Sequence, residues 1–153
     1  MDKKLLHAIL LKNVCIEINE RRNMSMRSDR RYRSLVYYRC MLSVIFRDNY
    51  GLTFESIGNE FQKNHATIIN AYKKGKWLLD MRYSDAIEVY EDVKSIVSYC
   101  EVIMGMSTDT ETAISTSIIN LFDSLIEQED LPPSKKSMIA YGVINIISEK
   151  YCL

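Results

Sequence analysis

Glycine and proline are scarce in this chain of 153 residues, which contains five glycines and two prolines. Both residues interrupt regular structure, so the composition favours an all-α protein with short connections. No apolar run approaches the roughly 18 residues that span a bilayer, so we expect no membrane partner. The first residues lack a full apolar core and a cleavage site, and they predict an amphipathic helix over 3–20 rather than a signal peptide.

Motifs of metal sites and of common enzymes are also missing. The four cysteines form no C-x-x-C pair and only two histidines accompany them, so we expect no metal site. Cys15, Cys40 and Cys100 fall among apolar neighbours, which predicts buried free thiols and fits a reducing cytoplasm. Because no phosphate loop, G-x-S-x-G or H-E-x-x-H motif occurs, we expect no catalytic residue, no cofactor and no small-molecule substrate.

Charge is present in equal amounts of both signs, but it is unevenly distributed. Residues 1–82 contain 16 Lys+Arg and 8 Asp+Glu, a net charge of +8, whereas residues 83–153 contain 4 and 12, a net charge of −8. Such asymmetry indicates a nucleic-acid partner for the basic part. An arginine run contributes much of the positive charge, although a solvated helix face is the alternative explanation: Arg21, Arg22, Arg27, Arg30, Arg31 and Arg33.

The stretch 52–76 predicts a short helix, a polar turn and a second helix. Thr53 is placed to cap the first helix, whose apolar residues recur at helical spacing. Gly58 lies in the middle of that helix, where it costs about 1 kcal/mol relative to alanine, and this predicts a close helix–helix approach. A helix-turn-helix of this kind can place the start of its second helix in a DNA major groove.

The second helix of this pair begins after the polar residues Gln62 and Lys63, and Asn64 is placed to cap it. Its predicted inner face comprises Ile68, Ile69, Tyr72 and Trp77. A cluster of lysines closes the helix, where cations are favoured by the helix dipole in any case: Lys73, Lys74 and Lys76.

A series of landmarks at fixed spacing runs through the region 27–79: Arg39, Ile57-Gly58, Phe61, Asn64-His65-Ala66-Thr67-Ile68 and Ala71. The region resembles the C-terminal DNA-binding domain of the bacterial replication initiator DnaA. In that family an arginine opens an amphipathic helix and an Ile-Gly pair follows nineteen residues later, then a Phe, an Asp-His-Thr-Thr-Val run and an Ala. The resemblance implies an all-α fold with a helix-turn-helix of the DnaA and Trp-repressor type, although the turn is one residue shorter than in many members. The ATPase phosphate loop of the initiator is absent.

The resemblance also implies roles for individual residues. The position of Arg39 reads the minor groove in the family, and the positions of Arg47 and Thr67 contact the DNA backbone. Base contacts in the major groove then come from Asn64, His65 and Ala66. Further phosphate contacts are expected from basic residues around the helix pair: Arg30, Arg31, Arg33, Lys63 and Lys73.

Two departures from the family pattern predict a different preferred DNA site. Asn64 replaces an aspartate, so an acceptor-only group becomes an amide suited to adenine. Ala66 replaces a threonine, so a hydroxyl is lost while a methyl that can touch thymine remains. The same helix start would be an ordinary surface in a protein that uses this fold for protein contacts, because a fold does not by itself imply a function.

The acidic part predicts three further helices. The first runs over 84–104 and ends at Gly105. A capping box at 108–111 begins the second helix, which runs to about 127, and the last helix starts near Pro133. The last helix is apolar nearly all round, which indicates the centre of a bundle or a dimer interface.

Taken together, the sequence predicts an all-α chain with a helix-turn-helix followed by a small helical bundle. Residues 1–82 form the basic DnaA-like domain and residues 83–153 the acidic bundle for interaction or dimerisation. The predicted function is sequence-specific binding of double-stranded DNA in the cytoplasm, at the nucleoid, in replication or transcription regulation, with a phage or mobile element as the expected source. The alternative is a protein-interaction module that inhibits a host protein through its acidic helices.

Overall fold

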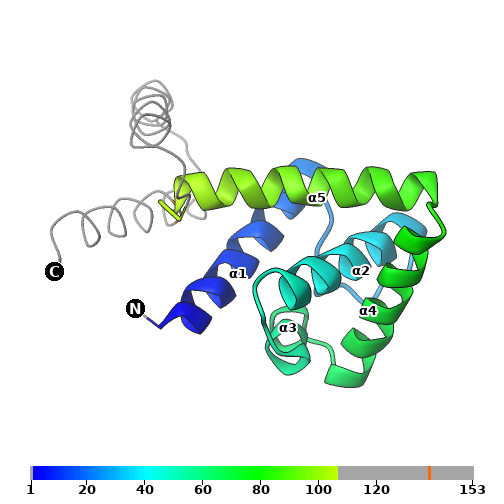
Figure 1. Cartoon of the computed structure of the whole chain (residues 1–153), viewed down its shortest axis with the longest axis horizontal. Helices are drawn as coiled ribbons and strands as arrows, with labels where there is room; N and C mark the ends of the chain where they lie inside the picture. Colours follow the sequence, from blue (N-terminus) through cyan, green and yellow to red (C-terminus); the bar gives the residue numbers. More distant parts are fainter. Residues whose placement is uncertain (1, 107–137, 139–153) are drawn as a thin grey trace, which may run out of the picture. The chain divides into compact units, whose positions relative to one another are not determined.

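The computed structural model describes residues 2–106 and 138. Within these residues the chain is all-helical, as predicted, and it contains α1 (Lys3–Arg22), α2 (Arg33–Asp48), α3 (Phe54–Phe61), α4 (His65–Asp80) and α5 (Ser84–Ile103) (Figure 1). The chain divides into two compact units between Ile96 and Val97. The helices predicted for 108–127 and from 133 onward lie outside the described residues.

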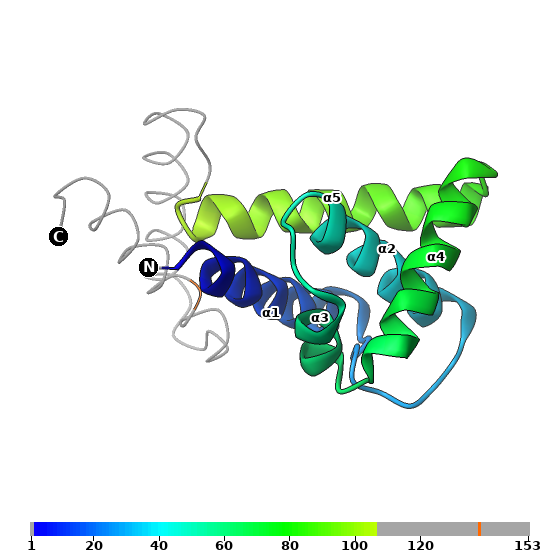
Figure 2. The same cartoon turned by 60° about the horizontal axis from the view of Figure 1, so that its bottom comes forward.

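Helix α2 is the central element of the first unit. It packs against α3 and α4, and α3 also contacts α1 and α4 (Figure 2). Apolar residues cover most of the α2 surface, and Leu35, Met41, Leu42 and Phe46 are fully buried. Each such side chain adds about 1.5–3 kcal/mol on burial, so α2 is the main source of the hydrophobic stabilisation of this unit.

Helix α1 forms over the predicted residues and extends two residues further. Asp2 caps its start by accepting from the backbone N–H of Lys4 at 3.1 Å, and Asn23 ends it in the left-handed region at φ 53°. Leu10 and Val14 are fully buried, as the helical periodicity predicts.

An ion pair with a tyrosine hydrogen bond joins three helices of the first unit. Arg22 at the end of α1 donates from Nη2 and Nε to the two carboxylate oxygens of Asp92 on α5, at 2.7 and 3.1 Å. The Tyr38 hydroxyl of α2 donates to the same carboxylate. The hydrogen bond from Arg22 lowers the pKa of Asp92, and burial raises the pKa of Tyr38 to about 12. The first unit therefore includes the beginning of α5, while the role proposed for 83–153 stays a prediction.

Helix α5 ends at Ile103, and Gly105 follows with a positive φ of 66°, as the sequence predicts. Cys15, Cys40 and Cys100 are buried and form no disulfide among the described residues, which confirms the prediction of buried thiols at these positions. In the part of the chain that the structure describes, no helix is long and apolar enough to cross a bilayer.

Candidate nucleic-acid interface

The α3–turn–α4 segment is built by the two predicted caps. Thr53 Oγ1 accepts from the backbone N–H of Ser56 at 3.1 Å and starts α3. Gln62 ends α3 in the left-handed region at φ 52°, and Asn64 Oδ1 then accepts from the backbone N–H of Thr67 at 2.8 Å. Capping by short polar side chains thus places the start of α4 at His65.

Gly58 allows the turn to fold back onto α3. A Cβ at this position would lie 2.5 Å from the carbonyl oxygen of Lys63 and 3.4 Å from Cγ1 of Ile68. The backbone N–H of Lys63 donates to the Gly58 carbonyl at 2.9 Å. The predicted close approach is therefore present, and its partner is the backbone of the turn as well as a side chain of α4.

The buried face of α4 differs in part from the predicted one. Ile68 is fully buried as expected, but Trp77 is 49% exposed and packs its ring 5.6 Å from that of Tyr83. Leu78 occupies the buried position instead. Gly75 also faces inward, because a Cβ there would lie 2.9 Å from the carbonyl oxygen of Cys40 on α2. The prediction for Trp77 is wrong because a tryptophan at a helix end can stack on a neighbouring surface ring instead.

The exposed start of α4 carries the residues expected to face DNA bases. His65, Ala66 and Thr67 are all exposed. Asn64 Oδ1 accepts both the Thr67 backbone N–H and the Thr67 hydroxyl, the latter at 2.9 Å. In this conformation Asn64 has only its NH₂ group left to offer a base, and the Thr67 hydroxyl proton is already used within the protein.

Arg39 is half-buried and binds the segment between α1 and α2. Its guanidinium donates to three backbone carbonyls, at 3.0 Å to Met26, at 3.1 Å to Arg30, and to Ser28. Burial lowers the pKa of this arginine. To reach a DNA minor groove, as the resemblance implies, Arg39 would have to release these carbonyls.

The other predicted phosphate contacts fall into two groups. Arg33 pairs with Asp85 at 3.2 Å and Lys63 pairs with Asp29 at 2.6 Å, so both have intramolecular partners. Arg47 donates to the Leu52 carbonyl at 3.1 Å and its guanidinium lies 4.8 Å from the centre of the Phe54 ring. Three exposed cations have no ion-pair partner among the described residues: Arg30, Arg31 and Lys73.

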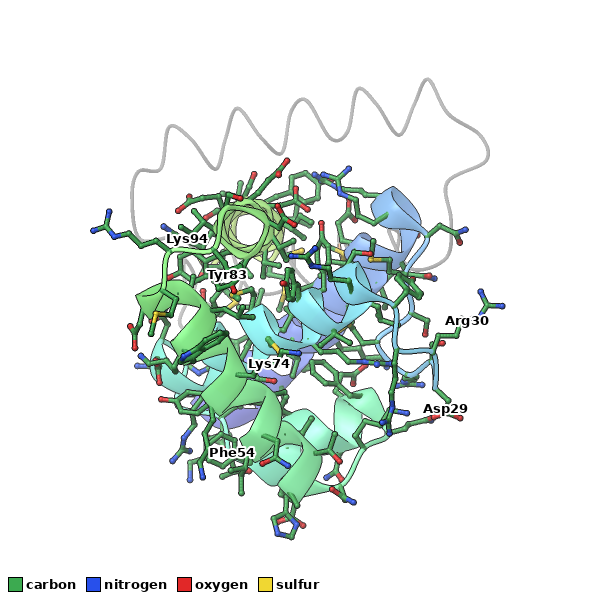
Figure 3. The ribbon with its side chains drawn as sticks, turned by 90° about the vertical axis from the view of Figure 1, so that its right-hand side faces the viewer. Asp29, Arg30, Phe54, Lys74, Tyr83 and Lys94 are labelled. Atoms are coloured by element: carbon green, nitrogen blue, oxygen red, sulfur yellow. The ribbon has the colours of Figure 1, made fainter. Side chains whose placement is uncertain are left out.

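A groove of about 620 Å³ adjoins α4 on the side of the 23–32 segment. Figure 3 shows Lys74 on α4, and Asp29 and Arg30 on that segment. The groove is lined by residues of α2, α4 and the connecting segments: Asp29, Arg31, Val36, Arg39, Cys40, Lys63, Thr67, Ile68, Asn70, Ala71 and Lys74.

Comparison with known proteins finds a similarity over part of the chain. A segment of 66 residues is 35% identical to the chromosomal replication initiator protein DnaA of Mycoplasma pneumoniae (strain ATCC 29342 / M129 / Subtype 1). The resemblance to DnaA is confirmed over this segment. It covers 43% of this chain and 15% of the initiator, so the chain spans a small part of its relative's length. No protein-family model and no solved structure matches the chain.

The structure adds residues to the predicted interface that the sequence did not assign. Lys74 was recognised only as one of three lysines near a helix end, and Asn70 had no role, yet both line the groove. Their spacing from Thr67 of three and seven residues places all three on one side of α4. Helical spacing could have indicated this stripe, but the opposite wall of the groove comes from a segment more than thirty residues earlier.

Proposed function

We propose that this chain is a sequence-specific double-stranded DNA-binding protein that acts in replication or transcription regulation. The observation that carries the proposal is the exposed start of α4, which presents His65 and Ala66 to solvent. The same unit exposes three cations that have no ion-pair partner among the described residues: Arg30, Arg31 and Lys73. An α-helix presented in this way fits a major groove about 12 Å wide. The partial identity to a replication initiator supports the same conclusion.

The proposed contacts combine the roles that the resemblance implies with the partners that each side chain has in the structure. Asn64 through its NH₂ group, His65 and Ala66 face base edges, while Arg30, Arg31, Arg47 and Lys73 face phosphates. Three further side chains reach phosphates only after they release their present partners: Arg33, Lys63 and Thr67. Arg39 reaches the minor groove only after it leaves the loop carbonyls. We further propose a cytoplasmic, nucleoid-associated protein whose source is a phage or mobile element.

Selection from a randomised duplex library tests this function. The winning duplex and a scrambled duplex are then titrated by fluorescence anisotropy at two salt concentrations. We expect binding to the selected site to be about a thousandfold tighter than to the control. The double variant Asn64→Asp, His65→Ala is expected to lose the preference for the selected duplex over the scrambled one while it retains nonspecific affinity. Failure to enrich any sequence, together with weak binding that disappears at 0.15 M salt, would contradict the proposal.

A second candidate function rests on the net charge of −8 over residues 83–153. An acidic segment of this kind could bind a basic host protein or a second copy of the chain. Sedimentation equilibrium of the full chain, whose mass is 17.8 kDa, would reveal self-association. A monomer that binds its selected duplex tightly would count against this candidate.

A further inference from the structure

The groove beside α4 has two walls that carry charge and a floor that is largely apolar. Thr67, Asn70 and Lys74 belong to the α4 wall, and Asp29 and Arg31 belong to the loop wall. Val36, Cys40 and Ile68 contribute apolar atoms, and Cys40 and Ile68 are buried. The α4 wall begins one residue after Ala66, so the groove is continuous with the proposed base-reading surface.

The positive charge that lines this groove is only partly neutralised by the protein. Four of its residues are cationic and one is anionic. The anion, Asp29, is bound by Lys63 at 2.6 Å. Arg39 donates to three carbonyls but has no carboxylate partner among the described residues. Arg31 and Lys74 are exposed, and no ion pair is recorded for either within residues 2–106.

Electrostatic effects on neighbouring groups agree with an excess of positive charge. Burial is the main cause that lowers the pKa of Arg39, and the charge of Arg31 adds to it, while Asp29 and Tyr32 act in the opposite direction. Lys74 and Arg39 oppose the rise in the pKa of Cys40, which burial nevertheless takes to about 11. Like charges this close to one another favour an anion between them.

We propose that this groove holds one sugar-phosphate strand of the bound duplex, and that Arg31 and Lys74 contact its phosphates from opposite walls. The inference rests on the proposed function and adds a site to it. A helix in the major groove has a phosphate backbone along each flank, because the groove is about as wide as the helix with its side chains. The flank of α4 formed by Thr67, Asn70 and Lys74 then lies along one of these two backbones.

In the free protein Arg39 acts as a positioning residue for this groove. Its three hydrogen bonds hold the carbonyls of Met26, Ser28 and Arg30, and so they fix the loop wall that carries Arg31. The guanidinium fork is suited to several carbonyls at once, whereas a lysine ammonium is a single point charge.

Charge-removal variants of the two groove cations test the proposal. Arg31→Ala, Lys74→Ala and the double variant are titrated with the selected and scrambled duplexes over a range of salt concentrations. Each single variant should weaken both duplexes equally, by about fivefold at 0.15 M salt, and reduce the magnitude of the salt slope by about 0.9. Lys94→Ala is the matched control, because Lys94 is an exposed lysine on α5 that does not line the groove (Figure 3).

Neutral phosphates in the duplex identify the strand that is bound. Single methylphosphonate substitutions are placed at successive positions of each strand of the selected site. One position, or two adjacent positions on one strand, should weaken binding by the wild-type protein more than binding by Lys74→Ala. The same position, or its neighbour on that strand, should show the same difference between the wild-type protein and Arg31→Ala.

The outcomes separate this inference from the proposed function. If the wild-type protein binds its duplex and both groove variants behave like Lys94→Ala, the groove inference is wrong and the function stands. If the wild-type protein binds no duplex even at low salt, both proposals fail. Sodium tripolyphosphate distinguishes a free phosphate compound from a DNA strand. Tight binding of tripolyphosphate that depends on Lys74 and does not compete with the duplex would overturn the assignment to DNA.

Discussion

At the scale of single residues, Gly58 illustrates how a backbone contact can oppose an intrinsic propensity. Alanine is the better helix former by about 1 kcal/mol, but its Cβ would lie 2.5 Å from the Lys63 carbonyl oxygen. We expect Gly58→Ala to destabilise the protein by about 1–3 kcal/mol, because the turn must shift. Chemical denaturation measures this, with Asn59→Ala at an exposed position of the same helix as the control. A Gly58→Ala protein at least as stable as the wild type would contradict the expected clash.

Asn64 combines a structural and a proposed recognition role, and substitutions can separate the two. Asn64→Ala removes the acceptor of two hydrogen bonds and should cost about 1 kcal/mol. Asn64→Asp keeps that acceptor and replaces the NH₂ donor with a negatively charged oxygen. We expect the aspartate variant to retain the wild-type melting temperature and to change its preferred duplex. Melting curves and a repeated duplex selection check both parts, and equal melting temperatures for all three proteins would argue against the cap.

At the scale of helices and loops, the cluster of Arg22, Tyr38 and Asp92 should make stability depend on pH. The pKa of Asp92 is lowered in the folded protein, so its contribution is complete above the unfolded value near 3.9 and is lost as the pH falls through the folded value. We expect Asp92→Asn to lower the free energy of unfolding by only about 1–2 kcal/mol at pH 7, because Arg22 is 44% exposed and solvent screens the ion pair. The difference from the wild type should shrink below pH 4.

Urea denaturation at several pH values measures this effect. Glu91→Gln is the neighbouring control, because Glu91 is 64% exposed and pairs only loosely with Lys94 at 3.9 Å. If the difference in unfolding free energy between Asp92→Asn and the wild type stays constant from pH 7 to pH 3, the stability does not depend on the ionisation of Asp92 and the expectation is wrong.

The conformation of the loop over residues 23–32 should depend more on Arg39 than on the loop's own residues. Arg39→Lys keeps the charge but cannot hold three carbonyls in the same way. We expect faster trypsin cleavage after Arg27, Arg30 and Arg31, while the helical circular dichroism is unchanged. Arg47→Lys serves as the control, and equal cleavage rates in the two variants would show that Arg39 does not restrain the loop.

The helices and caps could be predicted from sequence because their determinants are local. Thr53 and Asn64 act on amides three residues away, and Gly105 acts on the helix that it follows. The groove could not be predicted, since it joins Arg31 to Lys74 across more than forty residues. The carbonyl partners of Arg39 were missed for a related reason, because backbone acceptors leave no pattern in the side chains.

At the scale of the whole molecule, the opposite charges of the two parts of the chain should affect DNA affinity. A chain that ends at Met106 keeps all five described helices and has a net charge of +4, compared with zero for the full chain. We expect it to bind the selected duplex more tightly at 0.01 M salt, where the Debye length is about 30 Å. The gain should fall towards zero as screening shortens that length to about 8 Å at 0.15 M.

Anisotropy titrations of both chains over this salt range test the expectation, with circular dichroism to establish that the shorter chain is folded. Equal affinities at every salt concentration would show that residues 107–153 have no electrostatic influence on DNA binding. A shorter chain that binds more weakly at low salt would instead show that these residues contribute to the contact.

The position of Trp77 gives the protein a spectroscopic probe of its own. It is the sole tryptophan of the chain, it is about half exposed, and it lies next to Tyr83 near the end of α4. At 1.5 Å per residue it stands about 18 Å along the helix from the first DNA-facing side chain. Lys74 lies only three residues before Trp77 on the same side of the helix, so a strand held in the groove as far as Lys74 should shift or quench the emission. A duplex that contacts the start of α4 alone should leave the emission nearly unchanged.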